Sequence, residues 1–508
     1  MGSGEGQSAG ARGSPAQGLQ ANAVGLVSVL FQSVANMAPA ASVAFSILFA
    51  ASYAGGATPL AVLVGLILCL LVAITIGQMA KYLPSAGGLY TYNARGLGTH
   101  VGFLAGWAFI MAEVVVAPGG LLIAGIVVSG ALHSNLGWPS WVWAPCVVLG
   151  ALAVWILVYR GIRLSTAASV ALGLFEIVVF LGLAITLIVH AGSANTVAVF
   201  NPSNHNKHGI GSLIPGILYA VFGVIGFEAA APLGEEARNP KRVIPRAVFG
   251  ACLGIGVFYL VCYYAATVFF GPSKMTTFID FNASDPWTGM AKVVWGLGFI
   301  VLIIALVSSA IAGSNASSVS TTRVGYSLAR IRMLPRVLAR IHPRFGTPSV
   351  ALHVQIALAL AYALVLGFVL RGPLNALVLQ GTISAILIIA IYICTGISCI
   401  VFYLREHRHE INPLLHIVIP FVGSIAFIPV LLAAFGIDFA GLGITALAWP
   451  ANYAPYVAFA WMVLGVLVLA YFAITNPDRI SQTRVVFAEQ EPEEIGIEDP
   501  GAPGEHVT

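Results

Sequence analysis

The chain has 508 residues, of which 59% are hydrophobic and only 8% charged, and its net charge is +4. A soluble domain carries about 25% charged residues, so this composition excludes an ordinary soluble protein and predicts a polytopic membrane protein. The small net charge gives no reason to expect nucleic-acid binding. The apolar runs are continuous rather than alternating, which favours an all-α bundle over a β-barrel.

Twelve apolar segments of membrane-spanning length are predicted along the chain. They cover residues 23–53, 59–82, 99–132, 141–159, 165–190, 211–233, 247–270, 293–327, 350–370, 374–403, 414–435 and 456–474. The polar residues 191–210 are expected to form an extracellular loop. Residues 1–21 are rich in Gly, Ser, Ala and Gln, and residues 476–508 are acidic, so we expect both to be disordered cytoplasmic tails.

The distribution of basic residues predicts the orientation of these segments. If the N-terminus is cytoplasmic, all Lys and Arg residues fall on the cytoplasmic side except Lys207, Lys274, Lys292 and Arg371. Cytoplasmic loops of membrane proteins carry an excess of Lys and Arg. The sequence therefore predicts a plasma (inner) membrane protein that crosses the bilayer twelve times, with both termini in the cytoplasm.

Two of the segments are interrupted near their middle. Segment 1 contains Asn36-Met-Ala-Pro39, and segment 6 contains Gly223 and Gly226 followed by the carboxylate of Glu228. Proline removes an N–H donor and disfavours helix in the preceding residue. Backbone that is broken at membrane depth is tolerated only where it is buried in protein or lines a cavity.

Because segments 1–5 and 6–10 are two sets of five, the second set starts on the opposite side of the membrane. Broken helices at corresponding places in two inverted halves indicate a secondary transporter with its site at the midplane. We therefore predict an inverted five-plus-five repeat, formed by residues 22–190 and 211–404. Two further helices would follow within residues 405–475.

Several motifs resemble those of the amino acid–polyamine–organocation superfamily, in particular its bacterial-type amino acid permeases. They are Pro84-Ser-Ala-Gly-Gly-Leu-Tyr90, Gly226-Phe-Glu228, Glu235-Glu-Ala-Arg-Asn-Pro-Lys-Arg-Val-Ile-Pro-Arg-Ala247 and Arg323-Val-Gly-Tyr-Ser-Leu-Ala-Arg-Ile-Arg-Met-Leu-Pro335. The resemblance covers about residues 23–475. It implies twelve helices with breaks in helices 1 and 6, and alternating-access transport of an amino acid or a related amine.

The resemblance also implies which residues bind the substrate. In this family the substrate carboxylate meets amides of the first break, and its amino group meets carbonyls of both breaks. The corresponding positions are Asn36, Met37, Ala38, Ala40, Phe222, Gly223, Val224 and Ile225, with Phe222 as an aromatic gate. This chain departs from the family by having Met-Ala-Pro-Ala-Ala-Ser in place of a glycine string.

Three acidic residues lie inside apolar segments, namely Glu113, Glu176 and Glu228. An intramembrane carboxyl group is costly and is by default a functional candidate, so all three are candidates for coupling transport to an ion. The alternative is a hydrogen-bonded structural carboxyl group. Proton-coupled relatives often carry a Lys in segment 5, whereas this chain has Glu176 near that place.

Hydroxyl groups of Ser308 and Ser309 in segment 8 are a candidate sodium site, because hard cations prefer oxygen ligands. Small hydroxyl residues also simply permit close helix packing. We expect no resident cofactor or metal, no catalytic residue, and H⁺ or Na⁺ as the coupling ion. The expected partners are a small amino acid or amine and the lipid bilayer. The sequence does not predict the oligomeric state.

The leading function is ion- or proton-coupled import of an amino acid. A polyamine transporter or an amino acid exchanger of the same fold is the alternative within transport. A membrane-bound amino acid sensor that binds without transporting is the alternative outside it. An enzyme is not expected, since the sequence contains neither a nucleophile motif nor paired catalytic motifs at helical spacing. Direct ATP-driven transport is not expected either, since no phosphate-binding loop is present.

Overall fold

The computed structural model describes residues 19, 21–204, 209–282, 284–438 and 441–475. The described residues are almost entirely helical, and their only β-type pairings are two isolated bridges. Apart from residues 19 and 21, the two predicted tails lie outside the described residues, as does Lys207.

The helices follow the apolar segments closely. In chain order they are α1 (Leu26–Met37), α2 (Pro39–Ala41), α3 (Leu48–Ala54), α4 (Thr58–Ala80), α5 (Leu89–Leu97), α6 (Thr99–Leu136), α7 (Trp143–Tyr159), α8 (Ile162–Ala191), α9 (Ile210–Val224), α10 (Pro240–Phe270), α11 (Pro286–Trp295), α12 (Phe299–Arg330), α13 (Ser349–Val369), α14 (Pro373–Glu406), α15 (Ile419–Ala434) and α16 (Ala454–Thr475).

Short irregular helices join two of these elements to their neighbours. The π-helix η1 (Ser42–Ser46) continues α2, and the 3₁₀ helix η6 (Phe227–Leu233) follows α9. Counted along the described chain, twelve helical stretches are long and apolar enough to cross a bilayer. The predicted all-α fold with twelve spans is therefore confirmed.

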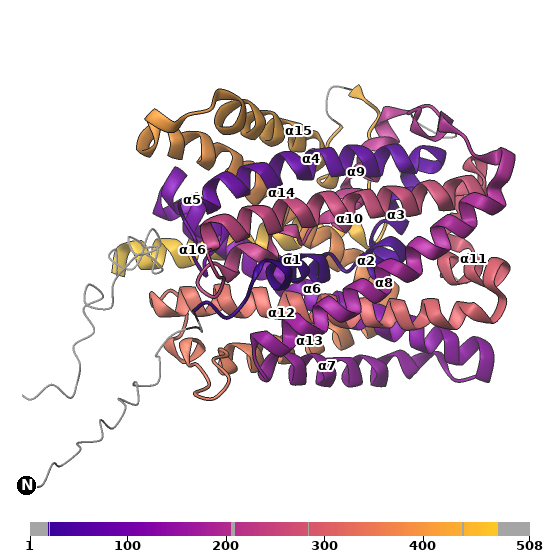
Figure 1. The fold of residues 1–508 in the computed structure, drawn as a ribbon, viewed down its shortest axis with the longest axis horizontal. Coiled ribbons are helices and arrows are strands. Elements are labelled where there is room, and N and C mark those ends of the chain that lie inside the picture. The colour runs from indigo at the N-terminus through magenta and orange to yellow at the C-terminus, as the bar shows by residue number, and fades with distance from the viewer. Residues whose placement is uncertain (1–18, 20, 205–208, 283, 439–440, 476–508) are drawn as a thin grey trace, which may run out of the picture.

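The interrupted first segment lies inside the bundle rather than at its surface. In Figure 1, α1 and α2 run through the middle, between α4 and α10 above and α12, α13 and α7 below. α1 packs against α8, α10, α12 and η6. The position explains why every residue from Ser33 to Met37 is buried.

Two elements differ from the sequence-based expectation. Residues 240–246 were expected in a loop, yet α10 begins at Pro240, where a proline at the first helical position is preorganised for helix. The turn-rich stretch after Pro84 leads into α5, a buried helix that the apolar periodicity did not predict. Residues 240–246 are the polar start of a long helix, and α5 is a short helix without an apolar run of its own.

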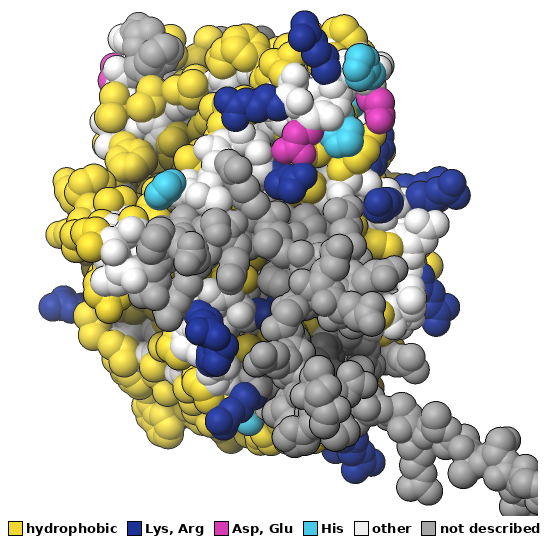
Figure 2. Space-filling model, turned by 90° about the vertical axis from the view of Figure 1, so that its left-hand side faces the viewer, with side chains coloured by type: hydrophobic (Ala, Val, Ile, Leu, Met, Phe, Trp, Pro, Cys, Tyr) yellow, Lys and Arg dark blue, Asp and Glu magenta, His cyan; other side chains and the backbone are white. Residues whose placement is uncertain are grey.

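Basic side chains gather around the end of the bundle at which α1 begins, shown in Figure 2. Exposed members of this set include Lys81, Arg238, Lys241, Arg242 and Arg405. We refer to this end as the basic end. α1 begins and α16 ends at this same end (Figure 1), as an even number of spans requires.

Candidate functional site

The first helix is broken at Ala38. This residue has a left-handed backbone conformation with φ 45°, and Pro39 follows it, so the hydrogen-bond ladder of α1 stops there. The carbonyl of Met37 instead accepts hydrogen bonds from the Ser42 hydroxyl at 2.6 Å and the Tyr259 hydroxyl at 2.7 Å. The broken backbone is thus held by side chains from within the bundle.

The amide groups after this break also have acceptors inside the protein. The amide of Ala40 donates to Glu176 Oε2 at 3.0 Å, and that of Ala41 donates to Ser309 Oγ at 3.1 Å. The resemblance implied that such amides would meet the substrate carboxylate. In this structure the Ala40 amide is bonded to a buried acid on α8 instead.

The second break lies at Ile225 and Gly226. α9 continues through Gly223 to Val224, and Gly226 then has φ 118°. A Cβ atom at position 226 would lie 2.8 Å from both the carbonyl carbon of Asn36 and the amide nitrogen of Met37. Glycine is therefore required here twice, for its positive φ and for the close approach of the two broken helices.

A small cavity lies between the two breaks. Its walls come from both broken helices and from α6, α12 and α14. The lining residues are Asn36, Ala38, Ala41, Ser42, Ser46, Val116, Gly119, Gly120, Ile123, Phe222, Ile225, Gly313, Leu377 and Gln380. None of these fourteen described residues is charged, and half of them are Gly, Ala or Ser.

Four of the eight predicted substrate-binding residues line this cavity, namely Asn36, Ala38, Phe222 and Ile225. The other four, Met37, Ala40, Gly223 and Val224, do not. Because the side chains of consecutive helical residues point in different directions, only part of each break faces the cavity. The ring of Phe222 lies at the cavity wall, where the expected gate would be.

None of the three buried acids lines the cavity, but each contacts a break. Asn36 Nδ2 lies 3.5 Å from Glu113 Oε1 at the first break. Glu228 Oε2 accepts from the amide of Gly226 at 3.0 Å and from the Tyr392 hydroxyl at 2.8 Å at the second break. Glu176 accepts from the amide of Ala40 in the same way. Each of the three carboxyl groups is therefore bonded to a residue at one of the two breaks, beside the cavity.

The candidate cation ligands Ser308 and Ser309 are in different environments. Ser309 is buried and bonded to the amide of Ala41, whereas Ser308 is partly exposed and donates to the Ala305 carbonyl at 2.9 Å. Both hydroxyl groups therefore have partners within the protein. Among the described residues no group of three or more His, Cys, Asp or Glu side chains is suited to a metal ion.

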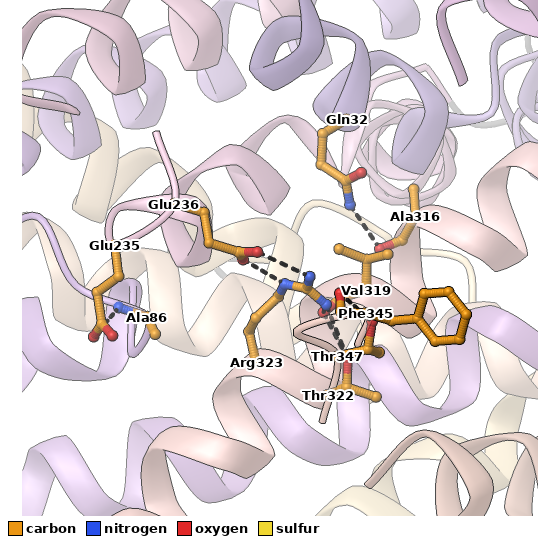
Figure 3. Close-up of polar contacts among 10 residues, drawn as sticks. All are labelled: Gln32, Ala86, Glu235, Glu236, Ala316, Val319, Thr322, Arg323, Phe345 and Thr347. Atoms are coloured by element: carbon orange, nitrogen blue, oxygen red, sulfur yellow. Dashed lines mark hydrogen bonds and ion pairs between the residues drawn. The ribbon is translucent and has the colours of Figure 1, made fainter. Parts of the chain in front are cut away.

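Between the cavity and the basic end the broken helices are closely packed. Ser33 Oγ donates to the carbonyl of Phe227 at 2.7 Å and accepts from the amide of Ala230 at 3.1 Å. Beyond them Arg323 forms an ion pair with Glu236 (Figure 3), and both side chains are 1% exposed. This end of the bundle is closed in the structure.

Sequence reasoning missed the cavity walls on α6 and α14. Gln380 is a polar residue inside an apolar segment, a signal that could have singled it out. Gly119 and Gly120 follow Pro118 inside α6 and bring bare backbone to the cavity. Gln32 of α1 donates to the Ala316 carbonyl of α12 at 2.9 Å and so joins these two helices (Figure 3).

A bundle of twelve membrane-spanning helices, with an uncharged cavity between two helix breaks, defines the class of membrane transporters. The family model for amino acid permeases matches residues 28–485, so the chain belongs to that family. The resemblance inferred from the motifs is thereby confirmed. The protein is a transporter of this family and not an enzyme.

Curated relatives are also similar over most of their length. The low-affinity putrescine importer PlaP of Escherichia coli (strain K12) is 26% identical over 357 residues, 70% of this chain and 75% of the relative. The serine/threonine exchanger SteT of Bacillus subtilis (strain 168) is 27% identical over 307 residues, 60% of this chain and 67% of the relative. The methylthioribose transporter of the same organism is 25% identical over 401 residues, 75% of this chain and 80% of the relative.

Proposed function

We propose that the protein is a secondary active transporter that imports an amino acid across the plasma membrane by alternating access. The observation that carries this proposal is the cavity between the breaks at Ala38 and Gly226. The last carbonyl groups of a helix have no partner in their own helix and carry partial negative charge, which suits an ammonium group. The ends of α1 and α9 supply such carbonyls beside the cavity.

The proposed direction of transport rests on which end of the cavity is sealed. Each broken helix has one half on the side of the basic end and one half on the far side of the break. The cavity-lining residues of these helices lie at the breaks or in the far halves, and none comes from η6, the half of the second broken helix that leads to the basic end. With the basic end in the cytoplasm, this arrangement is an outward-facing or occluded state. Substrate would enter from outside, and Phe222 would close over it.

Release would then require the basic end to open. The bundle formed by the first two and the sixth and seventh membrane segments would rock against the remaining helices, separating Arg323 on α12 from Glu236. The ion pair between Arg330 and Glu235, at 2.8 Å, crosses the same boundary. These two contacts would act as the cytoplasmic gate.

We further propose that protons drive import. Three buried carboxyl groups contact the breaks, so adding or removing a proton there would change the bonds that hold the broken helices. The hydroxyl groups expected to bind sodium are instead bonded to backbone. A pH gradient should therefore drive uptake into reconstituted vesicles, and a sodium gradient alone should not.

The proposal is tested by uptake into vesicles across the twenty amino acids and common polyamines. Ile123 lines the cavity, so Ile123→Trp should block uptake. Leu149 is 66% exposed on the outer surface of α7, so Leu149→Trp is a matched control that should transport normally. The proposal fails if the wild-type protein takes up no member of the panel.

The names of two relatives suggest other forms of transport, since one is an exchanger and another imports putrescine. Exchange would show as uptake that requires substrate inside the vesicle. A polyamine substrate would show in the panel itself. Binding of an amino acid with no uptake in either format would indicate a sensor.

A further inference from the structure

Gln380 is a polar side chain in the cavity wall to which the proposed mechanism gives no role. It lies on α14, is 1% exposed and lines the cavity. Its Oε1 atom has no hydrogen-bond partner among the described residues. A buried polar atom without a partner costs free energy, so its presence in a cavity wall points to a ligand that supplies the missing bond.

The side chain of Gln380 is held in place by the opposing wall. A Cβ atom at Gly119 would lie 2.3 Å from Gln380 Oε1, so the amide rests directly on the bare backbone of α6. A Cβ at Gly381 would lie 2.6 Å from the ring of Phe222. Gln380 therefore precedes Gly381, the residue of α14 that packs against the ring of Phe222, the proposed gate.

A second unpaired acceptor lies at the first break. Asn36 Oδ1 has no hydrogen-bond partner within the part of the chain that the structure describes, while its amide nitrogen faces Glu113. Asn36 thus places an unpaired acceptor beside the helix carbonyls that suit the substrate's amino group. Gln380, on a different helix, is the other lining residue with an unpaired acceptor, and it can contact a different part of the same substrate molecule.

The other residues that line the cavity limit the chemical nature of the substrate group that Gln380 can contact. The described lining residues include no acid or base, and a buried ammonium or carboxylate group without a counter-charge is strongly disfavoured. A side-chain amide can turn to offer either its oxygen or its nitrogen. The group that it recognises is therefore neutral and able to donate and accept hydrogen bonds.

We propose that Gln380 is the specificity-determining residue of the cavity and selects neutral amino acids whose side chain ends in a hydroxyl or carboxamide group. This inference rests on the proposed transport function. A site that forms a hydrogen bond to such a group discriminates strongly against an analogue that lacks the group. An apolar pocket discriminates much less between two substrates that differ only in shape. Threonine and valine have nearly the same shape and differ by this hydroxyl group.

The test measures the ratio of threonine uptake to valine uptake in vesicles. The wild-type protein should prefer threonine at least 10-fold, and Gln380→Leu should reduce that preference to about 2-fold or less. Gln355→Leu is the matched control, because Gln355 is 2% exposed with an unpartnered Oε1 but does not line the cavity. Its ratio should stay at the wild-type value.

Gln380→Glu provides a second variant of nearly unchanged shape. The added carboxylate should favour substrates with an ammonium group on their side chain, raising lysine uptake relative to threonine at least 10-fold. The inference is overturned if wild-type protein transports valine as well as threonine, or if neither Gln380 variant changes these ratios. Absence of all uptake by the wild-type protein would instead overturn the proposed function.

Discussion

Arg323 of α12 and Glu236 of the segment before α10 form an ion pair in which Arg323 Nε lies 2.8 Å from Glu236 Oε2. Both side chains are almost fully buried, and the guanidinium also reaches the Val319 carbonyl and the Thr322 hydroxyl (Figure 3). Removing one partner of a buried pair leaves an uncompensated charge. This contact ties α12 to the segment that follows the second break.

We therefore expect Glu236→Ala to destabilise the protein by about 3–5 kcal/mol. It should also open the basic end, so that a cysteine introduced between the cavity and Arg323 reacts faster with a membrane-impermeant reagent. Thermal unfolding in detergent and labelling rates check the two effects. Glu406→Ala is the control, because the Glu406–Arg95 pair is exposed, lies outside the proposed gate, and its loss should cost less.

A second prediction concerns the replacement of Gly226 at the second break. Gly226→Ala would place a methyl group 2.8 Å from the backbone of the first break and would strain a residue at φ 118°. We expect a loss of about 1–3 kcal/mol in stability and of nearly all uptake. Gly254→Ala in α10 is the matched control, since nothing lies within 4 Å of its Cβ position. Equal uptake by the two variants would contradict the close approach of the two breaks.

The fold could be predicted because long apolar runs and the placement of basic residues are local properties of the sequence. The two breaks were harder to locate. Gly223 and Gly226 look alike in the sequence, yet only Gly226 interrupts the helix. Gly223 remains helical and packs against Ile47, a contact that depends on where the first helix lies.

The candidate site was predictable only on the two broken helices. Pro39 in the first segment and Gly223 and Gly226 in the sixth predict helix breaks. Broken backbone at membrane depth in turn predicts a cavity. Nothing local indicates that α6 and α14 form its other walls, because Gly119 and Gln380 lie in separate segments that meet only in the folded bundle. The side chains that hold the breaks, such as Tyr259 and Ser33, were missed for the same reason.

A contact beyond the end of the second membrane-spanning helical stretch, Leu48–Ala80, gives a prediction for pH dependence. Tyr82 follows α4 and donates its hydroxyl proton to Glu410, and this hydrogen bond raises the pKa of Tyr82 to about 12. Its ordinary pKa is about 10. A pKa that is raised on folding means that the contact stabilises the fold fully below about pH 10 and loses its effect as pH rises towards 12.

Tyr82→Phe keeps the ring that packs on Phe402 and Tyr403 but removes the hydroxyl group. We expect the melting temperature of the variant to lie below that of the wild-type protein at neutral pH, and the gap to close between about pH 10 and 12. Tyr471→Phe, which alters an exposed residue of α16, should show no such gap. A gap that persists unchanged at pH 12 would contradict the Tyr82–Glu410 bond as its source.

The three buried acids give the prediction that tests proton coupling. A glutamine in place of each acid keeps an acceptor oxygen but cannot exchange a proton. If Glu176 carries the coupling proton, Glu176→Gln should reduce uptake driven by a pH gradient at least 10-fold. Exchange of labelled for unlabelled substrate across the same vesicles should continue, because exchange does not consume the gradient.

Glu113→Gln and Glu228→Gln are measured in the same way, and the variant that separates the two activities identifies the coupling residue. A variant that loses both activities has lost the geometry of its break, as Glu228 would through its bonds to Gly226 and Tyr392. Glu406→Gln is the control, since Glu406 pairs with Arg95 at the surface. Gradient-driven uptake that survives in all three variants would show that none of the buried acids carries the coupling proton.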